Sequence, residues 1–486
     1  MNPSSYASLP ERFFARVPPT PVAAPTLIKI NHELAADLKF TAAGLDAAAL
    51  TGVFSGNALP PGTAPIAMAY AGHQFGHFVP QLGDGRAILI GEMRDQAGVS
   101  RDIQLKGCGR TPYSRSGDGR AALGPVLREY LVSEAMHALG IPTTRSVAAV
   151  TTGETVQREA ALPGAILTRV AASHVRVGTF EYFSARGDTG GVRLLADYVI
   201  DRHYPSAAQD KAPYLALLSQ VVARQASLIA QWMNVGFIHG VMNTDNMAVS
   251  GETIDFGPCA FMDGFDPAAV FSSIDQRGRY AYVNQPHAAV WNLARFAESL
   301  LPLIDAKPEQ AIGAATEIVS GFAALFAECW LNGMRRKLGL STAETEDRRL
   351  AEDLLGVMHR NQADFTLTFR ALCDAPDDPS AARIGGCFAD ARAFDEWAQR
   401  WQARLSREPA TASSRAESMR RANPAYIPRN HRMEQMIAAA VEQGDFAPFE
   451  QLSTLLSKPY QEQAAFVSYA APPAPAERVL QTFCGT

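Results

Sequence analysis

Two short loops in this sequence carry an amide and a carboxylate at a close, fixed spacing. Asn246 ends the segment His239-Gly-Val-Met-Asn-Thr-Asp-Asn, and Asp255 begins Asp-Phe-Gly nine positions later. Protein kinases hold two Mg²⁺ ions with a catalytic-loop Asn and an Asp-Phe-Gly Asp in this order. The pair therefore predicts a metal site that carries nucleotide phosphate.

The first of these loops lacks the base of an ordinary kinase. When the sequence is aligned on Asn246, the kinase His-Arg-Asp becomes His239-Gly240-Val241, and a valine cannot accept a proton. Asp245, directly before Asn246, supplies a carboxylate at a different point of the loop. Each motif alone is also common loop sequence, but their order and spacing together favour a kinase-like site with a relocated base.

A glycine turn precedes an apolar segment of strand length. The turn is Leu82-Gly83-Asp84-Gly85-Arg86, and glycines at such a turn let backbone N–H groups approach phosphate. A plain hairpin turn has the same sequence. The neighbouring motifs favour the phosphate interpretation.

Lys106 and Glu129 are spaced like the kinase lysine and glutamate that orient nucleotide phosphate. Lys106 ends an expected strand, and Glu129 lies on the expected helix that follows. Both could instead be surface residues. Because apolar residues flank Glu129 on its helix, we expect it to be partly buried and to need a cationic partner. We therefore favour an ion pair.

The segment between Lys106 and that helix is typical of an anion site. Residues 107–120 contain four glycines and three arginines just ahead of a helix amino terminus. Arg169 and Arg176 add two more positive charges farther along. Either arginine could equally brace the junction between a small and a large lobe.

Other common sites are disfavoured. His73 and His77 are four residues apart, but Gln74 replaces the glutamate of a His-Glu-x-x-His zinc motif and neighbouring glycines disfavour a helix. The sequence has no phosphate-binding loop ending in Gly-Lys-Ser/Thr and no Gly-x-Ser-x-Gly elbow with a plausible triad.

The apolar patterns predict the elements that must position these residues. Apolar and β-branched runs of strand length, joined by a turn-like connection, predict antiparallel strands over 86–93 and 102–106, and helical periodicity predicts helices over 121–139, 214–232, 290–304, 311–338 and 433–441. We expect an α+β, protein-kinase-like bilobal fold with terminal extensions. The expected parts are an N-terminal extension (1–60), a β-rich small lobe (61–185), a helical large lobe (186–406) and a C-terminal tail (407–486) that begins with a linker over 407–415.

Composition limits the cell compartment and the partners. The 486 residues carry 44 Lys and Arg against 49 Asp and Glu, a balance that does not favour nucleic acid or a membrane surface as a partner. The six cysteines show no paired Cys-x-x-Cys spacing, which argues against a zinc site and a secreted disulfide scaffold. With no signal-peptide pattern and no apolar run of about 18 residues, we expect a cytoplasmic protein.

Taken together, the motifs resemble the selenoprotein O (YdiU) pseudokinase family, in its cysteine-containing bacterial form. The resemblance covers most of the chain and is carried by the segments 71–77, 82–86, 104–115, 243–247 and 255–258. That family has a protein-kinase-like fold, binds ATP in an inverted orientation and transfers AMP to protein hydroxyls. The resemblance therefore implies an adenylyltransferase that uses ATP and Mg²⁺ or Mn²⁺ to modify Ser, Thr or Tyr and releases pyrophosphate, with UTP left open as a second donor.

Two other functions remain open. One is an ordinary ATP-dependent phosphotransferase, against which Val241 counts. The other is a nucleotide-binding scaffold without activity, against which the intact set of polar site residues counts.

The resemblance also assigns residues, motif by motif. Asp245 is the expected general base, Asn246 and Asp255 the expected metal ligands, and Glu129 the partner of Lys106. The nucleotide is expected among Gly83, Gly85, Arg86, Lys106, Asp118, Gly119, Arg169, Arg176 and Asp255.

Cys484 occupies the third position from the carboxyl end, where family members often carry selenocysteine or cysteine. A disulfide from Cys484 to Cys259, two residues beyond Gly257, would couple activity to thiol status. The alternative is two unrelated thiols.

Overall fold

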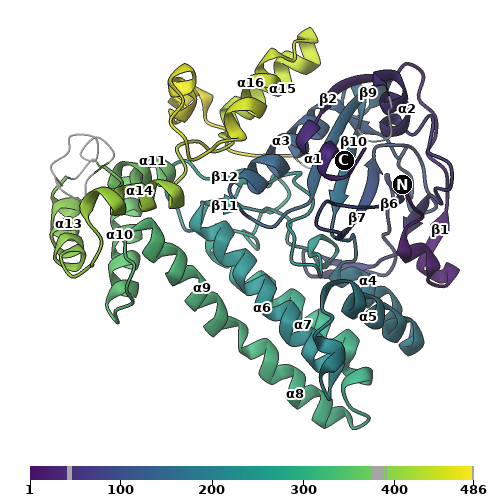
Figure 1. The fold of residues 1–486 in the computed structure, drawn as a ribbon, viewed down its shortest axis with the longest axis horizontal. Coiled ribbons are helices and arrows are strands. Elements are labelled where there is room, and N and C mark those ends of the chain that lie inside the picture. The colour runs from purple at the N-terminus through teal and green to yellow at the C-terminus, as the bar shows by residue number, and fades with distance from the viewer. Residues whose placement is uncertain (41–45, 375–387, 389–390, 484–486) are drawn as a thin grey trace.

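The structure is a computed structural model that describes residues 1–40, 46–374, 388 and 391–483. It is a mixed α/β fold in which a twisted sheet forms one side of the molecule and a group of helices forms the other (Figure 1). The sheet comes from the first part of the chain, and the helices come mostly from the part after residue 176.

All neighbouring strands of the main sheet are antiparallel. The eight strands follow the order β1-β3-β6-β7-β10-β9-β2, with β8 paired to β10. Their bounds are β1 Phe14–Arg16, β2 Thr26–Ile30, β3 Ile66–Met68, β6 Ala87–Arg94, β7 Ser100–Lys106, β8 Ala121–Ala122, β9 Arg145–Gln157 and β10 Ala161–Ala171. The predicted strand pair is confirmed as β6 and β7, in which Ala87 pairs with Lys106. The N-terminal segment supplies both edge strands, β1 and β2.

Helices cover both faces of the sheet. Alternation along β6 places Ile88 and Ile90 in the core under α1 (His32–Asp37) and α2 (Ala47–Ser55), and places Leu89 in the core on the other face. On that second face α3 (Leu123–Ala138) packs against β9 and β10. This confirms the predicted helix over 121–139, which ends at Gly140 in a left-handed conformation (φ 79°).

The helical part contains the remaining long elements. They are α4 Val177–Ser184, α5 Thr189–His203, α6 Pro213–Asn234, α7 Gln285–Ile304, α8 Pro308–Ser320, α9 Phe322–Lys337, α10 Asp347–Asn361, α11 Phe365–Leu372, α13 Ala391–Leu405, α14 Ala412–Ala422, α15 Asn430–Gln443 and α16 Ala447–Leu456. Two short strand pairs lie outside the main sheet, β4 (Gly72–Gln74) with β5 (His77–Val79) and β11 (Phe237–Ile238) with β12 (Ala260–Phe261).

Two expectations for this part need correction. The predicted helix over 311–338 is two helices, α8 and α9, which meet at Gly321. Glycine has a lower helix propensity than every residue except proline. The predicted linker over 407–415 was wrong over its second half, because α14 begins at Ala412. Thr411 caps α14 by accepting a hydrogen bond from the Ser414 N–H (3.3 Å). The polar composition of the segment had indicated a linker instead. The helices predicted over 214–232, 290–304 and 433–441 are confirmed as α6, α7 and α15.

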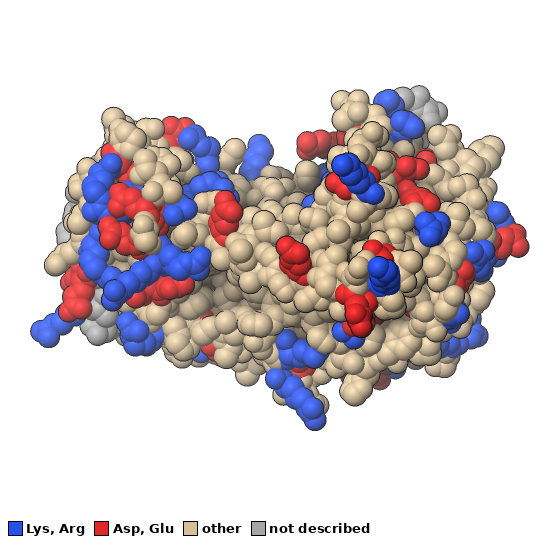
Figure 2. All heavy atoms as spheres, turned by 90° about the horizontal axis from the view of Figure 1, so that it is seen from below, with Lys and Arg blue, Asp and Glu red and all other residues tan. Residues whose placement is uncertain are grey.

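Helices α8 and α9 form an apolar stretch on the underside of the molecule. Within the described residues, Pro308–Lys337 is the one helical stretch long and apolar enough to cross a membrane, judged by length and composition alone. Figure 2 shows that underside with a broad, sparsely charged area between two charged ends. The stretch also packs against α6, as a surface helix of a globular protein does.

A buried arginine fastens the C-terminal helices to the rest of the helical part. Arg429 precedes α15, has a side chain only 1% exposed, and donates to Asp263 (2.5 Å) and Asp364 (2.8 Å). It also donates to the carbonyl oxygen of Ala470 (3.0 Å). One guanidinium therefore joins three separate segments.

We predict that Arg429→Met lowers the free energy of unfolding by about 3–5 kcal/mol, because it leaves two carboxylates without their buried cation. Urea denaturation followed by circular dichroism measures this. The matched control is Arg421→Met, whose ion pair with Glu417 is largely exposed (side chains 66% and 70% exposed); it should change stability by less than about 1 kcal/mol. Equal losses in the two variants would contradict the prediction.

Candidate active site

Many of the predicted residues meet at one cavity of about 480 Å³. The cavity lies where the glycine turn before β6, the glycine-rich segment after β7 and the loops that contain Asp245 and Asp255 come together. From the predicted set, its lining includes Gly83, Gly85, Arg86, Asp118, Gly119, Asp245 and Asp255. Segments far apart in the sequence thus bring glycine turns, an arginine and carboxylate side chains to one space.

A buried network of charges lies beside this cavity. Lys106, the last residue of β7, donates to Glu129 of α3 (2.6 Å) and to Asp255 (2.7 Å). Arg169 of β10 donates through Nε to the other oxygen of Glu129 (2.9 Å) and lies 3.9 Å from Asp255. The expected ion pair between Lys106 and Glu129 is therefore present, and Arg169 completes it.

The cations keep both carboxylates of this network ionised. Burial alone would raise the pKa of Asp255, but Lys106, then Arg169 and Arg86 outweigh burial and hold it well below its usual range. Arg169 and Lys106 likewise outweigh burial at Glu129 and lower its pKa. Asp255 also has a left-handed backbone (φ 70°), a costly conformation for a residue with a side chain and one often found at functional sites.

The oxygen donors of Asn246 and Asp255 fit a hard divalent cation. The Asn246 amide N–H₂ donates to the carbonyl oxygen of Val241 (3.1 Å), so that the side-chain carbonyl oxygen of Asn246 is the atom that could ligate a metal. Mg²⁺ is commonly held by one or two protein oxygens, with water and phosphate as its other ligands. In the described ranges no group of three or more His, Cys, Asp or Glu side chains could hold a metal without such help.

Asp245 is a carboxylate in a dry setting. The residue is 7% exposed, and burial raises its pKa to about 6, opposed by the charge of Arg176 and by a hydrogen bond from Gln74. Arg176 also donates to the backbone carbonyl oxygen of Asp245 (3.0 Å). A carboxylate with this pKa is mostly ionised at neutral pH and is a stronger base than an ordinary aspartate.

Two glycine segments close over the cavity. Gly83 has φ 82°, and a Cβ there would lie 2.3 Å from Cγ of Tyr113. Gly119 has φ 71°, and a Cβ there would lie 2.1 Å from the carbonyl oxygen of Gly109. Both positions therefore require glycine for conformation and for space.

Arg169 and Arg176 are not part of the cavity lining. Arg169 bonds to Glu129, and Arg176 contacts Asp245 and lies 3.7 Å from Asp84. Both arginines therefore contact carboxylates beside the cavity, and their predicted contact with nucleotide stays a prediction.

The sequence did not single out several residues that line the cavity: Tyr70, Gln74, Tyr113 and Arg158. Arg158 pairs with Asp118 (2.9 Å). The two residues lie 40 positions apart, and no sequence pattern predicted this contact. Gln74 lies in segment 71–77, which carries part of the family resemblance, but no role of its own was predicted for it from the sequence, where it served only to exclude a zinc motif.

The predicted disulfide stays a prediction. Cys259 is buried, and its thiol donates to the carbonyl oxygen of Phe256 (3.3 Å). Cys484 lies outside the described residues.

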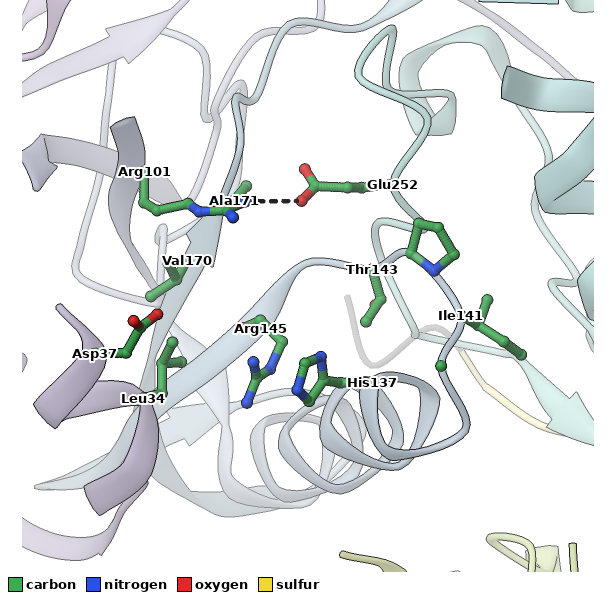
Figure 3. Close-up of a pocket in the computed structure, with 12 residues that line it drawn as sticks. Leu34, Asp37, Arg101, His137, Ile141, Thr143, Arg145, Val170, Ala171 and Glu252 are labelled. Carbon is green, nitrogen blue, oxygen red and sulfur yellow. Dashed lines mark ion pairs between the residues drawn. The ribbon is translucent and has the colours of Figure 1, made fainter. Parts of the chain in front are cut away.

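A second cavity, of about 330 Å³, lies between the end of α3, the end of β10 and the loop before Asp255 (Figure 3). Glu252 accepts the Ala172 N–H (2.9 Å) and lies 3.8 Å from Arg101, the pair marked in Figure 3. Burial raises the pKa of Glu252 to about 7. None of the predicted site residues lines this cavity, so it is not the candidate active site.

Comparison with known proteins agrees with the geometry. Residues 2–457 match the family model described as protein adenylyltransferase SelO. Proteins named protein nucleotidyltransferase YdiU are similar over 99% of this chain: one from Bradyrhizobium sp. strain BTAi1 is 62% identical, with 98% of its length covered, and one from Rhizobium meliloti is 60% identical, with 99% covered. A third, from Rhodopseudomonas palustris, is 61% identical, with 98% of its length covered. The chain therefore belongs to the protein adenylyltransferase SelO family.

Proposed function

We propose, from this family membership and the geometry of the site, that the chain is a protein nucleotidyltransferase that transfers AMP from ATP to protein hydroxyl groups. The observation that carries the proposal is the cavity that both Asp245 and Asp255 line, with Asp255 bonded to Lys106, while Val241 occupies the usual sequence position of the kinase base. The acceptor hydroxyls in this proposal are those of Ser, Thr and Tyr.

The proposal includes a protein-kinase-like bilobal architecture. The strands β3 and β6–β10 with α3 would be the small lobe (61–185), to which β1 and β2 of the N-terminal extension add the edge strands, and the helices α5–α13 would form most of the large lobe (186–406). The support is local: a strand lysine bonds to a helix glutamate, and an Asn loop precedes an Asp-Phe-Gly loop beside that pair.

In the proposed reaction the protein positions phosphates and removes one proton. The backbone at Gly83 and Gly85, with Arg86 and Lys106, would neutralise phosphate charge. A divalent ion held by Asn246 and Asp255, Mg²⁺ or Mn²⁺, would supply further charge neutralisation when bound.

Asp245 would take the proton of the acceptor hydroxyl as its oxygen attacks the α-phosphorus. The new bond joins that oxygen to phosphorus, the bond to the bridging oxygen of the β-phosphate breaks, and pyrophosphate leaves with the electron pair.

The proposed partners are ATP and hydroxyl-bearing proteins, with no nucleic acid or membrane, and the proposed compartment is the cytoplasm. The near balance of charge supports partners other than nucleic acid or an anionic membrane surface.

We predict that label from the α-phosphate of ATP becomes covalently attached to protein, including some attached to this protein itself, whereas γ-phosphate label does not. Parallel incubations with the two labelled forms, with and without a chelator of divalent metals, measure this. Transfer of γ-label alone would show a phosphotransferase. Binding of ATP with no transfer of either label would show a scaffold.

Removing the two key carboxylates should have different effects. Asp255→Ala is expected to abolish labelling, because it removes the ionised group that carries metal charge. Asp245→Asn is expected to lower turnover by about 10²–10⁴-fold while ATP binding changes little, since a general base acts on the acceptor. Rates of α-label transfer and ATP affinity by titration calorimetry measure these effects; wild-type turnover in Asp245→Asn would place the base elsewhere.

Lys106→Ala and Glu129→Gln should each slow α-label transfer, and the double variant should lose much less than the product of the two losses. Both changes disrupt one phosphate-orienting unit, so their effects are not independent. The matched control pair is Lys29→Ala with Glu450→Gln, an ion pair between β2 and α16 remote from the cavity, and it should leave the rate unchanged. Multiplicative losses at Lys106 and Glu129 would show that they act separately.

A further inference from the structure

The β4–β5 hairpin lies alongside the loop that contains Asp245 and is hydrogen-bonded to that loop at successive positions. The backbone N–H of His73 donates to the side-chain oxygen of Thr244 (2.7 Å), and the N–H of Phe75 donates to the side-chain oxygen of Asn243 (3.0 Å). These bonds lie on either side of Gln74. They fix the register of the hairpin against the loop, so that one hairpin side chain is aimed at one loop residue.

A carboxylate on α4 ties the same two segments together. Glu181 is buried, contacts Nδ1 of His73 (2.5 Å) and accepts a hydrogen bond from the hydroxyl of Thr244. The hairpin therefore does not depend on its two backbone bonds alone. A rigid support of this kind is what the placement of a side chain to within a fraction of an ångström requires.

Two glycines allow the hairpin to approach this closely. A Cβ at Gly72 would lie 2.7 Å from Oδ1 of Asp245, and a Cβ at Gly178 would lie 2.2 Å from the carbonyl oxygen of Ala71. Side chains at these positions would push the hairpin away from the loop. The close packing presses the carboxyl group of Asp245 against the hairpin backbone.

The two oxygens of Asp245 consequently have different surroundings. Oδ1 is buried against Gly72 and has no hydrogen-bond partner among the described residues. Oδ2 accepts a hydrogen bond from Nε2 of Gln74 (3.1 Å). Because Asp245 lines the candidate cavity while its Oδ1 is buried, Oδ2 is the oxygen on the cavity side.

We propose that Gln74 is a positioning residue for the transfer reaction: its amide holds Oδ2 of Asp245 so that the remaining lone pair of that oxygen faces the incoming hydroxyl group. The inference rests on the proposed function, in which Asp245 accepts the hydroxyl proton. A carboxylate oxygen can accept two hydrogen bonds, so the bond from Gln74 leaves room for the acceptor. Without it the carboxyl group is free to rotate, and a misplacement of about 1 Å can cost on the order of 10²-fold in rate.

A positioning role and a merely structural role predict different kinetics. If Gln74 acts through Asp245, its loss lowers the maximal rate of transfer and leaves the ATP concentration at half-maximal rate unchanged, since Gln74 is not needed to hold phosphate. Its loss also has no further effect once the carboxylate is gone. A residue that only stabilises the hairpin would change both kinetic parameters, and its effect would persist without the carboxylate.

The test uses the full-length protein and the rate of self-labelling from ATP carrying label on the α-phosphate, measured across ATP concentrations. Gln74→Met keeps the length of the side chain and removes the amide donor. It is combined with Asp245→Asn to complete a double-mutant cycle. Gln310→Met, on the exposed surface of α8 and remote from the cavity, is the matched control for the same chemical change.

We expect Gln74→Met to lower the maximal rate about 10-fold or more, with half-saturating ATP within about 2-fold of wild type. The double variant should be no slower than Asp245→Asn alone, and Gln310→Met should match wild type. A wild-type rate in Gln74→Met, or losses that multiply in the double variant, would overturn the proposal. If Asp245→Asn itself retains the wild-type rate, the assignment of the general base fails, a result distinct from failure at Gln74.

Folding is checked by the melting temperature of each variant. Should Gln74→Met unfold, Gln74→Glu replaces it, because this variant keeps the shape of the side chain and exchanges the donor for a carboxylate that repels Asp245. It is expected to lose at least as much turnover. Unfolding of both variants would show that Gln74 serves the fold and would refute a positioning role.

Discussion

The site depends on one buried group of four charges. Lys106, Arg169 and Glu129 lie together away from water, Asp255 joins them at the edge of the cavity, and each carboxylate contacts at least one cation. Taking such ions out of water is costly unless each is paired and hydrogen-bonded, so the elements that carry them must meet at fixed distances. Strand β7, strand β10, helix α3 and the Asp-Phe-Gly loop are therefore held in one arrangement by the requirement to neutralise this group.

The segment after Asp255 is held just as firmly from behind. Arg128 of α3 donates to the carbonyl oxygens of Gly257 (3.2 Å) and Cys259 (2.6 Å), and it also contacts Asn430 of α15 (3.3 Å). The side chain of Thr482 donates to the carbonyl oxygen of Pro258 (2.6 Å). These bonds satisfy three successive carbonyl groups and explain how Asp255 can keep a backbone conformation that costs energy.

Whether a contact could be predicted from the sequence depends on how far apart its two residues lie along the chain. Lys106 and Glu129 were predicted to pair because a strand and the next helix form a local unit with a recognisable spacing. The bond from Gln74 to Asp245 joins residues 171 positions apart, and no periodic pattern reports such a contact. Local signals also failed where polar residues have two uses. The segment around Thr411 has the composition of a linker, yet the side chain of Thr411 caps the first turn of α14.

The C-terminal helices are part of the support of the site, although the sequence predicted only a tail with one short helix over 433–441. Arg429 is buried and bonds to Asp263 and Asp364, so α15 cannot leave without exposing two unpaired carboxylates. Because α15 also packs on α3, the helix that carries Glu129, its position is transmitted to the charged group through one rigid element. The chain thus fixes the two carboxylates of the candidate site from two sides, with the β4–β5 hairpin against Asp245 and the C-terminal helices behind the segment that follows Asp255. Such double support suits a reaction in which the protein contributes mainly position and charge.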